Sequence, residues 1–159
     1  MHPRAAELIR HLVLQPHPEG GHYAEVFKSP HRVERGEGGD ARAALTTIYF
    51  LLAQGERSRW HRVASDELWH YYEGDPLELV WEEAGEVRRV QVGPVAMGRE
   101  PVAVVPAGSW QAARARGAYT LVGCTVAPGF EFTDFALLAD KPEEATRLRA
   151  RYPELGDFF

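Results

Sequence analysis

The feature that most constrains this fold is a series of short β-type segments at even spacing along the chain. They are rich in β-branched and aromatic residues, and glycine, proline or aspartate stands between most of them. We count about nine or ten such segments, whereas helical patterns occur only near the two ends, over residues 4–14 and 141–152. Strands without helices between them predict an all-β antiparallel sandwich or barrel rather than a βαβ fold.

Residues 44–53 predict the central strand of this architecture. The segment is apolar on both faces, which is typical of a strand that is buried on both sides. Residues 29–42 are polar and contain Gly36, Gly38 and Gly39, so we expect a surface loop there. The other expected strands cover residues 22–28, 67–72, 77–82, 87–92, 102–105, 110–116 and 118–126.

The size and charge of the chain limit its partners. The 159 residues suit a single domain, 1–159. The net charge of −5 argues against nucleic acid or an anionic membrane as a partner, because both require a basic face. The one cysteine, Cys124, lies in an apolar segment and predicts a buried structural thiol. Neither a secretory signal nor an apolar run of the ~20 residues that span a membrane occurs, so we expect a cytoplasmic protein.

Residues 58–74 carry most of the side chains that can do chemistry. His61 and Glu67 are potential metal ligands or acid–base groups, and both lie at or near the start of the strand expected over 67–72. Gly74 begins the turn that ends this strand. Because the start of a strand is a rigid platform, side chains there can point into a cavity between sheets.

Several motifs resemble those of the cupins, which are small double-stranded jelly-roll barrels. The first cupin motif contains two histidines, a glutamate and a glycine, and His61, Glu67 and Gly74 match it. The second motif, Pro-x-Gly with a histidine three residues later, is matched by Pro106-Ala107-Gly108, with Gln111 at the histidine position. Together with Pro-His-Pro-Glu-Gly-Gly, Ser-Asp-Glu-x-Trp-His and Gly-Cys-Thr-Val-Ala-Pro-Gly-Phe, these motifs resemble the cupin-5 family over nearly the whole chain.

The resemblance implies a jelly-roll barrel that pairs as a homodimer, and a structural likeness to deoxysugar-nucleotide epimerases and germins. Cupins that bind a metal supply three histidines and one glutamate. Val63 and Gln111 stand at two of the histidine positions here, so His61 and Glu67 remain as good ligands and Gln111 as a weak one. We therefore predict no tightly bound cofactor; a weakly bound divalent transition metal is the alternative.

We predict a small-molecule pocket inside the barrel, with His61 and Glu67 as catalytic residues. The predicted ligand-binding residues are Tyr49, Trp60, His70, Tyr71 and Gln111.

Each ligand-binding assignment has an alternative. Strand alternation puts His70 on the face opposite to Glu67, where it would contact another sheet or a dimer partner. Aromatic residues such as Tyr49 and Trp60 could belong to the core, and Gln111 could satisfy backbone groups. His17 and His22, which bracket a Pro-Glu-Gly-Gly turn, either shape the opening of the pocket or belong only to the turn.

Three functions stay open at this level. The first is a metal-independent isomerase or epimerase acting on a carbohydrate-like ligand, with His61 as base and Tyr49, Tyr71 or Tyr72 as acid. The second is a non-catalytic module that binds or senses a small ligand. The third is a metal-dependent, oxygenase-like cupin that uses His61 and Glu67.

Overall fold

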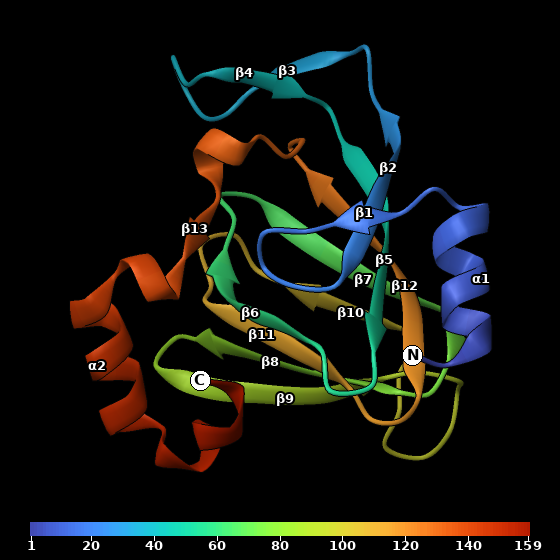
Figure 1. The fold of residues 1–159 in the computed structure, drawn as a ribbon. Coiled ribbons are helices and arrows are strands. Elements are labelled where there is room, and N and C mark those ends of the chain that lie inside the picture. Colours follow the sequence, from blue (N-terminus) through green and yellow to red (C-terminus); the bar gives the residue numbers. More distant parts are fainter.

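Two antiparallel sheets face each other in the computed structural model, which describes residues 1–159 (Figure 1). The six-stranded sheet contains, in spatial order, β1 (Gln15–Pro16), β2 (His22–Lys28), β5 (Thr46–Ala53), β12 (Tyr119–Ala127), β7 (Asp66–Gly74) and β10 (Val102–Val105). The five-stranded sheet contains β13 (Ala136–Leu137), β6 (Arg57–Arg62), β11 (Gln111–Ala115), β8 (Leu77–Glu83) and β9 (Glu86–Val92). A separate pair, β3 (Arg32–Glu34) with β4 (Ala41–Ala43), extends beyond one end of the barrel (Figure 1).

Helices cover part of the outer face of each sheet. Helix α1 (Pro3–His11) buries Ala5 and Leu8 against the six-stranded sheet. Helix α2 (Pro142–Arg151) and the 3₁₀ turn η3 (Pro153–Phe158) bury Leu148 and Leu155 against the five-stranded sheet. Figure 1 shows α1 and α2 on opposite sides of the barrel. Two further 3₁₀ turns, η1 (Phe132–Asp134) and η2 (Leu138–Asp140), flank β13. The expected jelly-roll barrel with short helices at both chain ends is confirmed, and none of these helices is long and apolar enough to cross a membrane.

Two segments differ from the expectation. Residues 29–42, expected to be a surface loop, contain the β3–β4 hairpin, which is largely exposed but pairs from Arg32 with Ala43 to Glu34 with Ala41. The strand β6 was not among the expected strands. Its sequence hides the usual alternation because polar residues, Ser58 and His61, point inward and Arg57 and Arg59 point outward.

The interior of the barrel has a packed half and an open half. Along β5, Phe50 is buried in the core, whereas Ile48, two residues earlier, lines a cavity. Along β7, Trp69 is fully buried and Glu67 lines the cavity. Inward-facing residues alternate along a strand. On β5 and β7, the inward residue at one end lines the cavity and the next inward residue is packed in the core. The packed half also contains Leu52, Leu77, Leu79, Val92 and Val122.

Candidate functional site

The open half of the barrel is a cavity of about 300 Å³. Its walls come from the six-stranded sheet, from β6, from the turn between β1 and β2, and from the segment that follows β12. Its polar lining includes Gln15, His17, Glu19, Glu25, His61 and Glu67, and its apolar lining includes Tyr23, Ile48, Val63, Cys124, Phe130 and Phe132. Apolar walls with a few convergent polar groups are typical of a small-molecule site.

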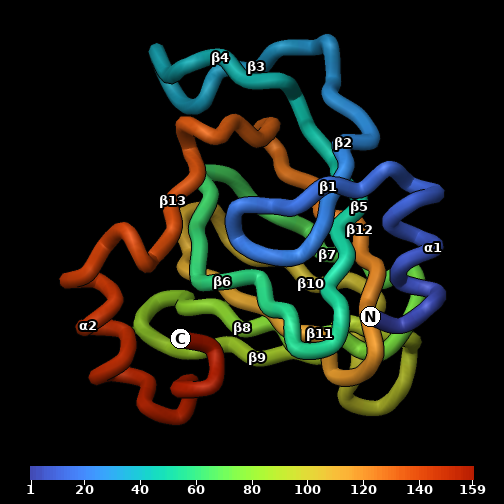
Figure 2. Tube along the Cα trace, in the orientation of Figure 1, coloured from blue at the N-terminus to red at the C-terminus, as the bar shows by residue number.

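Glu19 enters the cavity on the turn between β1 and β2. In Figure 2 this blue segment crosses between β6 and β5. Gly20 and Gly21 have φ of 113° and 68°, and a Cβ at either position would collide with the backbone oxygen of Arg57 or Leu51. Only glycine therefore allows the turn to approach both strands. The Arg59 amide donates to the Glu19 carbonyl at 2.7 Å, which fixes the turn to β6.

The Glu19 carboxyl is buried and mainly neutral at pH 7. Burial raises its pKa to about 8, against the opposing effects of Ser58 and Arg59. The Ser58 hydroxyl donates to Oε1 at 2.7 Å. The other oxygen, Oε2, lies 3.4 Å from His61 Nε2. Glu19 can therefore act as a proton donor at neutral pH.

A bulge in β6 places His61 in the site. The pairing of β11 with β6 shifts register between Gln111 and Ala113, so that Ser58 and His61 both point inward although they are three residues apart. His61 Nδ1 donates to the Arg59 carbonyl at 2.7 Å, which leaves Nε2 as an acceptor facing Glu19. Burial lowers the pKa of His61, so the imidazole is neutral.

Glu67 is held by a chain of buried hydrogen bonds. The Trp69 indole donates to Gln111 Oε1 at 3.0 Å, and Gln111 Nε2 donates to Glu67 Oε2 at 2.6 Å. The indole bond fixes which end of the Gln111 amide faces Glu67. Burial raises the pKa of Glu67 to about 7, against the opposing effects of His61 and of the Gln111 hydrogen bond. At neutral pH both protonation states of Glu67 are populated.

His17 completes the polar wall in its neutral form. Burial lowers its pKa to about 4. The backbone amide of Glu19 donates to His17 Nδ1 at 3.2 Å, so Nε2 carries the proton. The ring stands edge-on to Tyr23, with centroids 4.6 Å apart.

Comparison with known proteins now identifies the family. The Cupin_5 family profile, described as cupin superfamily (DUF985), matches residues 6–138. The chain belongs to the Cupin_5 family. A hypothetical protein from Leishmania major is 39% identical with a TM-score of 0.77, over 83% of this chain and 85% of that chain. A protein from Shewanella oneidensis is 33% identical with a TM-score of 0.80, over 94% and 90% of the two chains.

More distant structures share the fold alone. A mutant of the Bacillus subtilis oxalate decarboxylase OxdC is 14% identical to this cupin, with a TM-score of 0.58 over 79% of this chain and 30% of that chain. No curated protein matches the sequence. The family resemblance predicted from the motifs is thus confirmed, and the cavity of this cupin has to be interpreted from its own residues.

The cupin barrel brings together His61 and Glu67, the two predicted catalytic residues. Gln111 lies behind Glu67 and does not line the cavity, because its amide is used by Trp69 and Glu67. It reaches the site only through Glu67. Gln111 is therefore a residue that positions Glu67 rather than one that contacts a ligand.

The other four predicted ligand-binding residues lie away from the cavity. Tyr49 and His70 are on the outer face of the six-stranded sheet, because they alternate with the inward residues Ile48, Phe50 and Trp69.

Trp60 and Tyr71 lie outside the cavity for different reasons. Trp60 is turned outward by the β6 bulge and packs on Phe158 and Phe159 of the C-terminal segment. Tyr71 faces the packed half of the barrel, and its hydroxyl donates to the Gly74 carbonyl at 2.7 Å. Tyr49, His70, Trp60 and Tyr71 therefore do not line the cavity of this cupin.

The sequence interpretation did not assign most of the lining to the cupin site, including Glu19, Tyr23, Glu25, Phe130 and Phe132. His17 was assigned only to the opening or to the turn, whereas its ring forms part of the cavity wall. For His17 and Glu19 the signal was present in the motif Pro-His-Pro-Glu-Gly-Gly, which contains both. From the sequence this motif predicts a turn. Glu19 becomes a site residue only because the turn packs on β6.

The residues of the cupin cavity do not fit a metal centre. No group of three or more histidine, cysteine, aspartate or glutamate side chains is arranged to hold an ion. His61 Nδ1 is used by a carbonyl, and its Nε2 faces a carboxyl whose pKa is raised to about 8. The position of a further donor is taken by Val63, which has none.

Proposed function

We propose that this cupin is a metal-independent isomerase or epimerase that transfers protons on a small carbohydrate-like molecule. One observation carries the proposal: two buried carboxyls, Glu19 and Glu67, line one cavity with pKa values of about 8 and about 7. A proton donor and a proton acceptor that are both active at neutral pH are what a 1,1- or 1,2-proton shift requires.

The roles follow from the protonation states. The Glu67 carboxylate removes a proton from a carbon next to a carbonyl group, while the Glu19 carboxyl gives its proton to the carbonyl oxygen. The product of this half-reaction is an enol, with Glu67 protonated and Glu19 ionised. When the carbon that lost its proton carries a hydroxyl group, this enol is an enediol. Glu67 then returns its proton to the former carbonyl carbon, and the hydroxyl on the neighbouring carbon gives its proton to Glu19. Both groups are regenerated and the carbonyl has moved by one carbon, which yields the isomer.

His61 and Gln111 support this exchange. His61 Nε2 faces Glu19 Oε2 as a neutral acceptor, so it favours the carboxyl proton on that oxygen. Gln111 donates to Glu67 and stabilises its ionised form. The acid of the earlier hypothesis, Tyr49, Tyr71 or Tyr72, is replaced by Glu19, because none of these tyrosines lines the cavity.

The proposal predicts hydrogen exchange at carbon. The protein, dialysed against a chelator, is incubated in D₂O with aldoses and ketoses, and deuterium incorporation next to the carbonyl is followed by proton NMR. We expect enzyme-dependent incorporation that falls by about 10²-fold or more in Glu67→Gln.

Glu86→Gln is the control, because Glu86 is an exposed carboxylate on β9 outside the cavity. Its exchange rate should equal that of the wild type. Exchange that depends on added metal would contradict the proposal. Binding of a sugar without any exchange would leave the cavity as a binding or sensing site, the main rival function.

A further inference from the structure

The lining of the cavity has an uneven charge distribution. Three glutamates line it, Glu19, Glu25 and Glu67, and no lysine or arginine does. Its two histidines, His17 and His61, both have pKa values lowered by burial and are neutral. An anionic ligand would therefore find no cation in the wall to replace its hydration.

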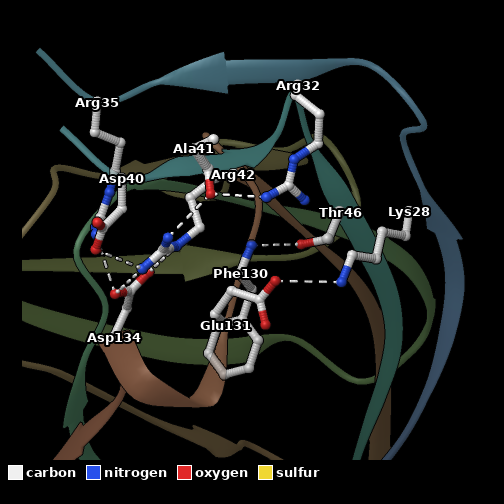
Figure 3. Close-up of polar contacts among 10 residues, drawn as sticks. All are labelled: Lys28, Arg32, Arg35, Asp40, Ala41, Arg42, Thr46, Phe130, Glu131 and Asp134. Carbon is white, nitrogen blue, oxygen red and sulfur yellow. Dashed lines mark hydrogen bonds and ion pairs between the residues drawn. The ribbon is translucent and has the colours of Figure 1, made fainter. Parts of the chain in front are cut away.

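The basic residues that contact the segment after β12, which carries Phe130 and Phe132, are paired with its acidic residues. Figure 3 shows Arg35 and Arg42 directed at Asp134, and Lys28 directed at Glu131. By contrast, Glu25 and Glu67 form no ion pair with a lysine or arginine. The free charge facing the cavity is therefore negative.

Aromatic rings line the same cavity as these carboxylates. Phe130 and Phe132 stand edge to face at 4.9 Å, and His17 and Tyr23 do so at 4.6 Å. Phe132 links the two pairs, with its ring 6.1 Å from that of His17. Phe132 is 51% exposed, which places it at the opening, and Glu25, which lines the same cavity, is also exposed.

Aromatic faces next to unpaired carboxylates attract an organic cation more than any other small ligand. The ring quadrupole attracts an ammonium group, and a carboxylate supplies its counter-charge. A neutral sugar would gain only hydrogen bonds from the same groups. A phosphate or carboxylate would meet like charge.

We propose that the cavity selects a ligand carrying a protonated amino group, held between the rings of Tyr23, Phe130 and Phe132 and the carboxylate of Glu25. The inference rests on the proposed function and narrows its substrate class to amino-bearing, carbohydrate-like molecules. Sugar nucleotides, which bring a diphosphate, are excluded from the cavity.

Binding of three probes with one carbon skeleton tests the inference. Calorimetry at slightly acidic pH compares D-glucosamine, D-glucose and D-gluconate, which are cationic, neutral and anionic. We expect glucosamine to bind at least tenfold more tightly than glucose, and gluconate not to bind. Glu25→Gln should weaken glucosamine binding by about fivefold and glucose binding much less, and Phe132→Leu should also weaken glucosamine more than glucose.

Glu86→Gln is again the control and should bind all three probes as the wild type does. Equal or tighter binding of glucose or gluconate, or no glucosamine binding at millimolar concentration, would overturn the inference. The assay needs no turnover. If the protein prefers glucosamine but exchanges no deuterium, the cation site is supported and the proposed catalysis is contradicted. If it exchanges deuterium without preferring glucosamine, the catalysis is supported and the cation site is contradicted.

Discussion

At the scale of single residues, Glu19 couples the charge of the site to the stability of the fold. Its pKa is about 8 in the folded state against 4.5 without burial, so the folded state binds more protons between these values. Its contribution to stability is complete below about pH 4.5 and is lost as the pH rises through about 8. The pKa values of His17 and His61 are lowered in the folded state, so these residues reduce stability as the pH falls below their unfolded value of 6.5.

Glu19→Gln should therefore change how stability depends on pH. The variant has no carboxyl to ionise, so its stability relative to the wild type should improve between about pH 6.5 and 8, by roughly 1.6 kcal/mol. Urea denaturation at both pH values measures this difference, and Glu86→Gln should show a constant difference from the wild type. A pH-independent effect of Glu19→Gln would mean that Glu19 is ionised in the folded state.

The sequence predicted His61 and Glu67 because their spacing follows a motif, which is a local property. Gln111 was also identified, but its role depends on Trp69, which lies on a strand of the other sheet. Glu19 could not be assigned, because its chemistry comes from burial against β6. The pKa of a side chain depends on the residues packed around it in the folded protein, and the local sequence of a turn does not reveal which residues these are.

At the scale of elements, the β3–β4 hairpin anchors the segment that carries the aromatic wall. We call residues 130–135 the opening segment. Arg42 binds Asp134 with two parallel bonds, from Nε at 2.9 Å and Nη2 at 3.0 Å, and Arg35 adds a third at 3.2 Å (Figure 3). The Arg42 bond lowers the pKa of Asp134. At the other end of the segment, the Phe130 amide donates to Thr46 Oγ1 at 3.0 Å.

Asp134→Ala should loosen both elements together. Asp134 and Arg42 are each only 11% exposed, so the substitution removes the carboxylate that Arg42 and Arg35 share and should cost about 2 kcal/mol. Hydrogen exchange should accelerate in residues 32–43 and in the opening segment. Glu131→Gln, which removes an exposed pair with Lys28, is the matched control and should cost less than about 0.5 kcal/mol. Exchange confined to the opening segment would show that the hairpin is held by other contacts.

The long strands were predictable and the short polar ones were not. Residues 44–53 are apolar enough to identify β5 directly. In β3 and β4 the side chains are mostly exposed, so no apolar alternation marks them. Arg35, in the turn after β3, and Arg42, on β4, bind Asp134, which lies 99 and 92 residues further along the chain. Local sequence patterns do not reveal contacts over such separations.

At the scale of the whole molecule, the six-stranded sheet leaves part of its outer face uncovered. On β7 and the edge strand β10, Tyr72, Val102 and Val104 are 50%, 42% and 50% exposed. Helix α1 covers the region around Leu51 and Leu121 but not these residues. An apolar face beside an unpaired strand edge favours association with a second copy.

We therefore propose that the protein is a homodimer through this face. Light scattering at micromolar concentration should give twice the monomer mass of 17.8 kDa. Val104→Glu should shift the protein toward monomer without unfolding it, because Val104 points away from the core. Val95→Glu, on an exposed loop, should leave the mass unchanged. A wild-type mass equal to the monomer would remove the proposal.

The packed half of the barrel decides how a reactant can reach Glu19 and Glu67. Trp69, Phe50 and Leu79 close the interior beyond the cavity, so the path is a dead end. A long chain cannot thread through such a site, and the interior units of a polymer cannot reach the two carboxyls. Under the proposed function, any polymer-derived reactant must therefore be a released monomer or a free chain terminus, and each product must leave through the opening before the next molecule arrives.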